Sequence, residues 1–165
     1  MSNGIKVKKR NGRGDEPLNL EKMHRMVEEA TKGVAGVSAS QVEIQSGIQF
    51  YDGITTQEIQ EILIKSASDL ISLDNPNYQY VAARLLLFSV RKNLYGKLRV
   101  LPHLEQHIMN CTNIDVYDKD IFTKYSKEEI DKVNGFIDHE RDFLFTYAGL
   151  RQVVDKYLVQ DRSGG

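Results

Sequence analysis

Apolar residues recur every three to four positions along much of this chain, the spacing that places them on one face of a helix. The first such repeat consists of Leu20, Met23, Val27 and Ala30. It predicts an amphipathic helix over 20–32. Gly33 is expected to end that helix, because glycine readily adopts the left-handed conformation common after a helix C-terminus.

Two further helix starts are predicted by pairs of residues with the spacing of a capping box, Ser38 with Gln41 and Thr55 with Glu58. In each pair the hydroxyl caps the helix and the second side chain reaches back. We expect the first of these helices to end near Phe50, ahead of a turn at Asp52-Gly53. The second is longer and continues to about Ser72.

A fourth helix is predicted to start at Asn75-Pro76, with the proline at the first helical position, and to end near Leu94 at Gly96. This stretch is apolar on more than one face. We therefore expect it to be the most buried helix of the chain.

Before the helices, residues 5–10 alternate between two sets, Ile5, Val7 and Lys9 against Lys6, Lys8 and Arg10. A period of two predicts a half-exposed strand. Asn11-Gly12 favours a tight turn, Leu18 can close a short return strand, and Asn19 can cap the first helix. Residues 1–95 are thus predicted to form one unit, a hairpin followed by four helices.

Pro102 indicates a boundary between two segments, and residues 96–165 are predicted to form a separate helical segment. We expect helices over about 103–110, from a cap at Ser126, and over about 143–158, with a loop over 112–125. Three helices without a sheet are too thin to make a core of their own, so this segment is expected to pack on something else.

Charge and cysteine content narrow the class of protein. The net charge is −1, which predicts no general attraction to nucleic acid or membranes. Five basic residues and no acid lie in 1–13, whereas the other 17 basic residues share the rest of the chain with all 23 acids. Cys111 is the single cysteine, which excludes an internal disulfide and favours a reducing, cytoplasmic setting. No apolar run approaches the ~20 residues of a membrane span.

The stretch over 7–22 carries the most suggestive chemistry, because cations, two acids and a helix start fall within a few residues. These groups can hold a phosphorylated ligand that bears a base. The plainer interpretation is a strand edge protected by lysines. The common phosphate-loop and dinucleotide motifs are absent.

Other candidate sites are weaker. His103 and His107 have the spacing of a helical metal pair and Cys111 follows them, but a surface or interface role is favoured. The charged run over 138–142 is expected to be a solvated turn with local ion pairs. No set of residues typical of nucleophilic or paired-carboxylate catalysis is evident.

Three segments resemble a known family, namely VKKRNGRGDEPLNLEKMHR (7–25), QFYDGITTQEIQEILIKSASDLIS (49–72) and NPNYQYVAARLLLFSVRKNLYG (75–96). They look like the ATP-cone domain at the start of the ribonucleotide reductase large subunit, and the last segment is the most specific. IDHERDFLFTYAGLRQVVDKYLVQDR (137–162) resembles the segment that leads into the catalytic barrel of that family. The resemblance covers essentially the whole chain and favours the class I, diphosphate-reducing enzymes.

This resemblance implies a mainly α fold, an ATP-cone four-helix bundle capped by a small N-terminal β-hairpin or sheet, followed by a short all-helical segment. It also implies that ATP or dATP, with Mg²⁺, binds under the hairpin as an allosteric effector that switches the enzyme on or off. By alignment with the family motif, Lys9, Lys22, Thr56 and Lys92 would gather the triphosphate.

The same alignment assigns the base to Glu16, which would accept from the adenine amino group, and to Asn19. The hairpin is one residue longer than expected, which leaves Asp15 and Glu16 as alternatives. The spacing to Asn19 favours Glu16. Leu18 and Phe88 would form apolar walls. Gln60 stands where relatives often have a histidine, and it can hydrogen-bond but cannot carry charge, which puts the discrimination between ATP and dATP in question.

The reductase reaction needs a thiyl-forming cysteine and a redox pair, so a chain with one cysteine is not expected to catalyse it or to hold a redox cofactor. The resemblance therefore implies an effector-sensing N-terminal fragment, or the first piece of a split subunit, that regulates overall activity in deoxyribonucleotide synthesis for DNA replication. Its expected partners are the remainder of the large subunit, the radical-bearing small subunit and further copies of itself. Two alternatives stay open: a non-enzymatic regulator that carries a cone, and a degenerate cone that serves only in subunit interaction.

Overall fold

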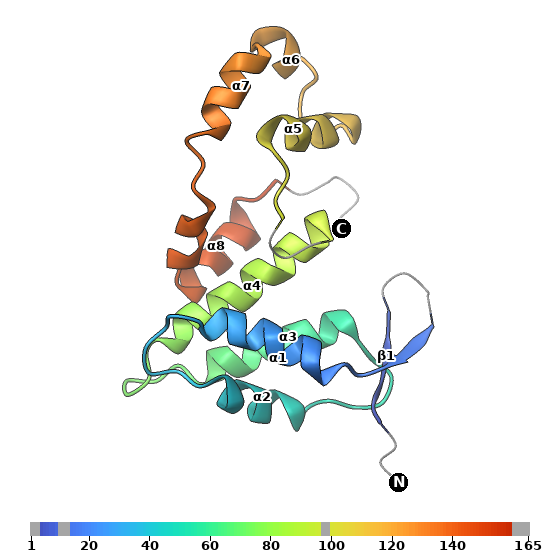
Figure 1. Cartoon of the computed structure of the whole chain (residues 1–165), viewed down its shortest axis with the longest axis vertical. Coiled ribbons are helices and arrows are strands. Elements are labelled where there is room, and N and C mark those ends of the chain that lie inside the picture. Colours follow the sequence, from blue (N-terminus) through green and yellow to red (C-terminus); the bar gives the residue numbers. More distant parts are fainter. Residues whose placement is uncertain (1–3, 10–13, 97–99, 160–165) are drawn as a thin grey trace.

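The computed structural model describes residues 4–9, 14–96 and 100–159. The predicted turn at Asn11-Gly12 lies outside them. Four helices form the predicted bundle, α1 (Leu20–Thr31), α2 (Ala39–Gly47), α3 (Thr56–Asp69) and α4 (Tyr78–Tyr95) (Figure 1). The mainly α fold with a small N-terminal sheet is confirmed. The start predicted for α4 is wrong by two residues, because Pro76 lies in a turn before the helix.

Three short strands cap one end of the bundle in the order β2-β1-β3. β1 (Lys6–Lys8) pairs antiparallel with β2 (Asp15–Pro17) and parallel with β3 (Ile54–Thr55). The turn at Asp52-Gly53 fixes β1 from two sides: the Lys6 N–H donates to Oδ1 of Asp52 at 2.8 Å, and the Gly53 N–H donates to the Lys6 carbonyl at 2.9 Å. The sheet is therefore tied to the loop ahead of α3.

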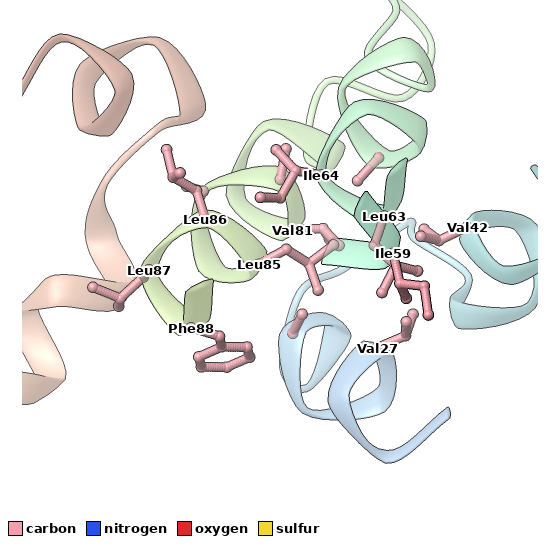
Figure 2. Packing of buried hydrophobic residues seen from close by; sticks show 14 of the residues in the cluster. Val27, Val42, Ile59, Leu63, Ile64, Val81, Leu85, Leu86, Leu87 and Phe88 are labelled. Carbon is pink, nitrogen blue, oxygen red and sulfur yellow. The ribbon is translucent and has the colours of Figure 1, made fainter. Parts of the chain in front are cut away.

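The core lies around α4, which is buried on several faces as predicted. Val27 of α1, Val42 of α2 and Leu63 of α3 are fully buried and point towards it (Figure 2). Phe88, which belongs to α4, is 2% exposed. Because α4 is apolar on more than one side, it needs helices on more than one side to cover it.

The predicted cap of α2 is confirmed, but its capping box is not reciprocal. Oγ of Ser38 accepts from the Gln41 N–H at 3.4 Å. The Gln41 side chain does not return this bond. Instead, the hydroxyl of the buried Tyr78 accepts from the Ser38 N–H at 3.0 Å and donates to Oε1 of Gln41 at 2.7 Å. A residue of α4 thus takes the place that the sequence pattern gave to Gln41.

The C-terminal part contains more elements than the sequence predicts: α5 (Leu104–Asn113), α6 (Ile121–Lys124), α7 (Lys127–Asn134), the 3₁₀ helix η1 (His139–Leu144) and α8 (Tyr147–Lys156). The expected loop over 112–125 contains α6. The single helix expected over 143–158 is two elements, because Thr146 caps α8 through the Gly149 N–H and starts it anew.

Part of this segment packs on the bundle. α8 lies along α4, and Leu150 belongs to the core cluster (Figure 1). α5 and α7 pack on each other further away, each with one buried isoleucine, Ile108 and Ile130. The division of the chain into 1–95 and 96–165 stays a prediction. Within the described ranges, no helix has both the length and the apolar character needed to cross a membrane.

The charged run over 138–142 is mostly exposed, as expected, but it is not a simple turn. It forms most of η1, and Asp142 makes an ion pair with Arg91 of α4, with 2.6 Å between Oδ2 and Nη2. The sequence predicted only local ion pairs here, because a partner 51 positions away leaves no local pattern.

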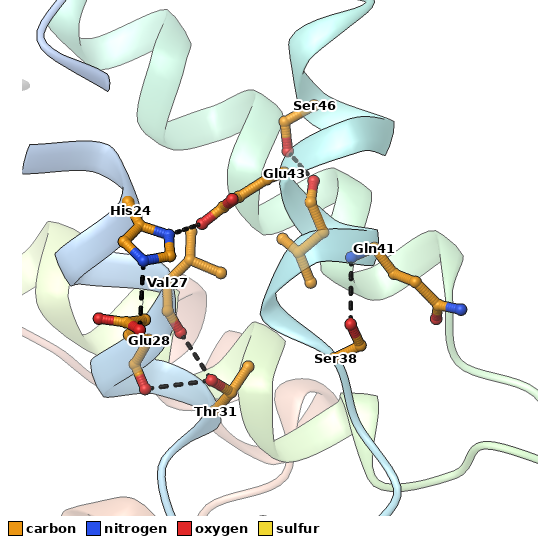
Figure 3. A network of polar contacts seen from close by, with 9 residues as sticks. His24, Val27, Glu28, Thr31, Ser38, Gln41, Glu43 and Ser46 are labelled. Atoms are coloured by element: carbon orange, nitrogen blue, oxygen red, sulfur yellow. Dashed lines mark hydrogen bonds and ion pairs between the residues drawn. The ribbon is translucent and has the colours of Figure 1, made fainter. Parts of the chain in front are cut away.

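A polar contact between His24 and Glu43 joins α1 to α2 on the outside of the bundle (Figure 3). Nδ1 of His24 lies 2.7 Å from Oε1 of Glu43 on α2. Nε2 of His24 lies 3.2 Å from Oε1 of Glu28, which is on α1 like His24 itself. The hydrogen bond with the Glu43 carboxylate raises the pKa of His24 above its ordinary value of 6.5. This contact is therefore a pH-dependent link between two helices.

The position of Leu63 predicts a large effect on stability. Leu63→Ala should lower the free energy of unfolding by about 2–5 kcal/mol, because it leaves a cavity in the packed core. Leu73→Ala is the matched control, since this side chain is fully exposed and its loss removes no packing. Urea unfolding followed by circular dichroism measures both. Similar losses in the two variants would contradict the packing described here.

The His24 contact predicts a pH-dependent effect. A pKa raised in the folded state means that the stabilisation is full below about pH 6.5 and is lost as the pH rises through the folded-state pKa. His24→Gln should therefore cost more free energy of unfolding at about pH 6 than at about pH 9. Urea unfolding at the two pH values is the measurement. The difference should shrink in a Glu43→Gln background, and an equal cost at both pH values would show that the contact is unimportant.

Candidate functional site

A cavity of about 1160 Å³ lies between the sheet and helices α1, α3 and α4. All nine residues predicted to bind the nucleotide line it: Lys9, Glu16, Leu18, Asn19, Lys22, Thr56, Gln60, Phe88 and Lys92. They come from four separate stretches of the chain, at residue 9, over 16–22, over 56–60 and over 88–92. The fold therefore brings the predicted residues together, while the role of each one in binding stays a prediction.

The strand alternation places Lys9 and Glu16 towards the cavity. Glu16 is paired with Val7, whose side chain is buried, so Glu16 shares the inner face of the sheet with it. Lys9 is two positions after Val7, and its Nζ lies 2.8 Å from Oε2 of Glu16. Asp15 is paired with Lys8 and does not line the cavity. This geometry favours Glu16 over Asp15 as the acid that faces a ligand.

Two helix N-termini border the cavity. Oδ1 of Asn19 accepts from the Lys22 N–H at 2.9 Å and caps α1. Thr55 caps α3 through the Glu58 N–H at 3.1 Å, which places Thr56 in the first turn at the cavity. Unpaired N–H groups and the helix dipole favour negative charge at such ends. Both starts are therefore suited to phosphate groups.

A complete capping box holds the start of α3. The Glu58 carboxylate accepts from the Thr55 N–H at 2.8 Å and from the hydroxyls of Thr55 and Tyr51 at 2.7 Å each. The hydrogen bond from the Thr55 backbone, followed by the Tyr51 hydroxyl, lowers the pKa of Glu58. The carboxylate is thus ionised at neutral pH and keeps the first turn of α3 in place beside the cavity.

Gln60 and Phe88 form the inner wall. Gln60 is 4% exposed, and its Oε1 accepts from the Ser89 hydroxyl of α4 at 3.2 Å. Phe88 is 2% exposed and lies one residue before Ser89. The carboxamide of Gln60 is thereby held between α3 and α4. At this position the side chain offers hydrogen bonds and no charge.

The charges around the cavity are predominantly positive. The cations are Lys9, Lys22, Arg25, Arg91 and Lys92, and the carboxylates are Glu16, Glu21 and Glu29. Glu16 pairs with Lys9, and Glu21 pairs with Arg25 along α1. Clustered cations beside apolar walls and a few carboxylates fit a ligand with a polyanionic chain and a base.

Several residues that line the cavity escaped the sequence prediction. Met26 and Glu29 follow Lys22 at helical spacing, so they lie on the same face of α1. That spacing could have predicted that they line the cavity with Lys22. Arg91 directly precedes Lys92 and is 7% exposed. Phe143 comes from η1, far along the chain, and no local pattern points to it.

The two histidines that the sequence marks as minor candidates, His103 and His107, have different surroundings. His103 lies near Asp131, with 3.7 Å between Nε2 and Oδ1. His107 packs edge to face against Tyr95 and Tyr117, and Cys111 lies beside it. Burial raises the pKa of the Cys111 thiol, which keeps it protonated. The structure thus gives the two histidines different neighbours, and the surface or interface role favoured by the sequence stays a prediction.

Comparison with known proteins agrees with this geometry. A family model described as the ATP cone domain matches residues 5–93, a range that contains all nine predicted residues. Ribonucleoside-diphosphate reductase subunit alpha of Haemophilus influenzae is 47% identical over 165 residues, and ribonucleoside-diphosphate reductase 1 subunit alpha of Escherichia coli is 46% identical. The subunit alpha of enterobacteria phage T4 is 45% identical over 132 residues, which cover 79% of this chain and 17% of the phage protein.

The first two alignments cover the whole of this chain, which spans only about a fifth of the length of those relatives (22% and 21%). The family match covers more than half of the chain and includes the sheet and the four bundle helices. The chain belongs to the ATP cone domain family.

Proposed function

We propose that this chain is the nucleotide-sensing N-terminal part of a ribonucleoside-diphosphate reductase large subunit. It binds ATP or dATP as an allosteric effector and so sets the overall activity of an enzyme that supplies deoxyribonucleotides for DNA replication. The observation that carries this proposal is the convergence of nine residues, from in and beside the strand pair and from three helices, on one cationic cavity. The similarity to reductase alpha subunits is the reason for proposing that the regulated enzyme is a ribonucleoside-diphosphate reductase.

Within this proposal the triphosphate lies among Lys9, Lys22, Thr56 and Lys92, where ammonium groups meet two helix starts. Mg²⁺ accompanies the phosphates, because it is commonly held by substrate phosphates and only one or two carboxylates. Glu21 is a carboxylate on the same wall as Lys22.

The base lies at Glu16 and Asn19, with Leu18 and Phe88 as apolar walls. The Glu16 carboxylate accepts from the exocyclic amino group of adenine, and the Asn19 amide completes the recognition. Gln60 lies deepest of the polar groups and meets the sugar or the phosphates without adding charge.

The effect on the enzyme is a shift of population. A nucleotide that binds one packing of the cone better than another favours that packing, and with it one arrangement of subunits. The partners are the remainder of the large subunit, the small subunit that carries the radical, and further copies of the chain. ATP and dATP act differently to the extent that their affinities for the two arrangements differ.

The phosphate assignment predicts the effect of removing an ammonium group. Lys9→Ala and Lys22→Ala should each weaken ATP and dATP binding by about 1.5–3 kcal/mol, because a charge-assisted hydrogen bond is lost. Lys65→Ala is the control, since Lys65 is exposed on α3 and does not line the cavity. Calorimetric titration in Mg²⁺ measures all three. Wild-type protein that binds neither nucleotide would refute the proposed function, and unchanged affinity in both variants would refute the placement of the phosphates.

The base assignment predicts a change in selectivity. Inosine triphosphate lacks the amino group of adenine, so wild-type protein should prefer ATP to it. Glu16→Ala should reduce that preference by about tenfold or more, because the carboxylate that accepts from the amino group is gone. Asp15→Ala is the matched control and should leave the ratio of the two affinities unchanged. The opposite pattern would show that Asp15 reads the base.

A further inference from the structure

Part of the lining of the cavity comes from beyond the part of the chain that matches the family model. That match ends at residue 93, whereas Phe143 lies in η1 and lines the cavity together with Phe88 and Arg91 of α4. The rings of Phe143 and Phe88 meet edge to face, with 6.2 Å between their centroids and 71° between their planes. The aromatic surface of the cavity is therefore shared between the cone and the segment that follows it.

Phe143 is held in this place by two cations on one face of α4. The guanidinium carbons of Arg84 and Arg91 lie 5.4 and 5.5 Å from the centroid of its ring. Arg84, Phe88 and Arg91 are four and three positions apart, so they line one side of the helix. Such cation–π contacts favour a fixed position for the ring.

An ion pair between Arg91 and Asp142 holds the residue that precedes Phe143. Nη2 of the buried Arg91 donates to Oδ2 of Asp142 at 2.6 Å, and Asp142 directly precedes Phe143. Arg91 therefore contacts both Asp142 and Phe143 of η1, and it also lines the cavity. The burial of its guanidinium makes the carboxylate partner important, because a buried charge without a partner is costly.

The helix that follows η1, α8, packs on the same helix α4. Leu150 is 6% exposed and belongs to the core, and Tyr147 and Val154 pack against the same cluster. η1 and α8 are thus docked on α4 by apolar contacts, by an ion pair and by Phe143 at the cavity. Because Phe143 belongs to η1, the lining of the cavity is complete only when η1 is docked on α4.

We propose that Phe143 is a further ligand-contacting residue of the effector cavity, and that nucleotide binding and the docking of η1 and α8 on α4 stabilise each other. This inference rests on the proposed function and names the element through which the bound nucleotide acts on the chain beyond the cone. By thermodynamic linkage, whatever the docked segment adds to nucleotide affinity, the nucleotide adds to the docking.

The chain contains no tryptophan, which allows a single fluorescent reporter. Phe143→Trp should show a saturable change in emission on titration with ATP and Mg²⁺, with the same midpoint as calorimetry on that variant. Phe136→Trp is the control, because Phe136 is 77% exposed and does not line the cavity. An unchanged emission of Phe143→Trp at saturating ATP, or an equal change in both reporters, would overturn the inference.

Truncation of the ring tests its contribution to affinity. Phe143→Ala should weaken ATP binding at least about fivefold, the lower end of typical coupling between sites. Phe143→Leu should retain part of that affinity, and Leu144→Ala, which alters an exposed neighbour in η1, should retain all of it. ATP binding by wild-type protein with unchanged affinity in Phe143→Ala would refute this inference and leave the proposed function intact. No ATP binding by wild-type protein would refute the proposed function itself.

Discussion

The burial of α4 is the constraint on which the rest of the structure depends. Its residues are apolar on several faces, so α1, α3 and α8 must each cover one of them. The cover is incomplete near the C-terminal end, where Phe88, Arg91 and Lys92 reach the cavity. The cavity thus arises where the helix that organises the core changes from apolar to basic residues. α4 thus provides one side of the site, and the sheet, α1, α3 and η1 provide the rest of its lining.

The sheet supplies the opposite wall and does so with few residues. β1 is fixed through the backbone of Lys6 to the loop ahead of α3, and Val7 is buried beneath it. Because side chains alternate along a strand, burial of Val7 commits Lys9 to the cavity. The same alternation turns Glu16 inwards and Asp15 outwards. Packing of one apolar residue therefore decides which charges a ligand meets, and local stability and recognition rest on the same contact.

Much of this arrangement could be predicted from the sequence, because local signals determine it. The caps at Asn19 and Thr55, the period of β1 and the helical repeats each depend on neighbours a few positions apart. The rest depends on contacts between distant residues. β3 is only two residues long and exists because it pairs with β1, and the Tyr78 hydroxyl enters the cap of α2 from 40 positions away. Phe143 reaches the cavity only through the docking of η1, whereas the sequence pattern predicted a solvated turn over 138–142 and a helix from about residue 143.

The most direct measurement is amide hydrogen exchange of the intact chain, with and without saturating ATP and Mg²⁺. The central claim is that a nucleotide lies between the inner face of the sheet and the starts of α1 and α3. It predicts slower exchange in 5–9, 15–22 and 54–60 when ATP is bound, because the ligand closes these elements over one another. The exposed surface of α7 should exchange at the same rate in both states and serves as the internal control. ATP binding without protection in any of these three ranges, or with protection only in α5 and α7, would contradict the account.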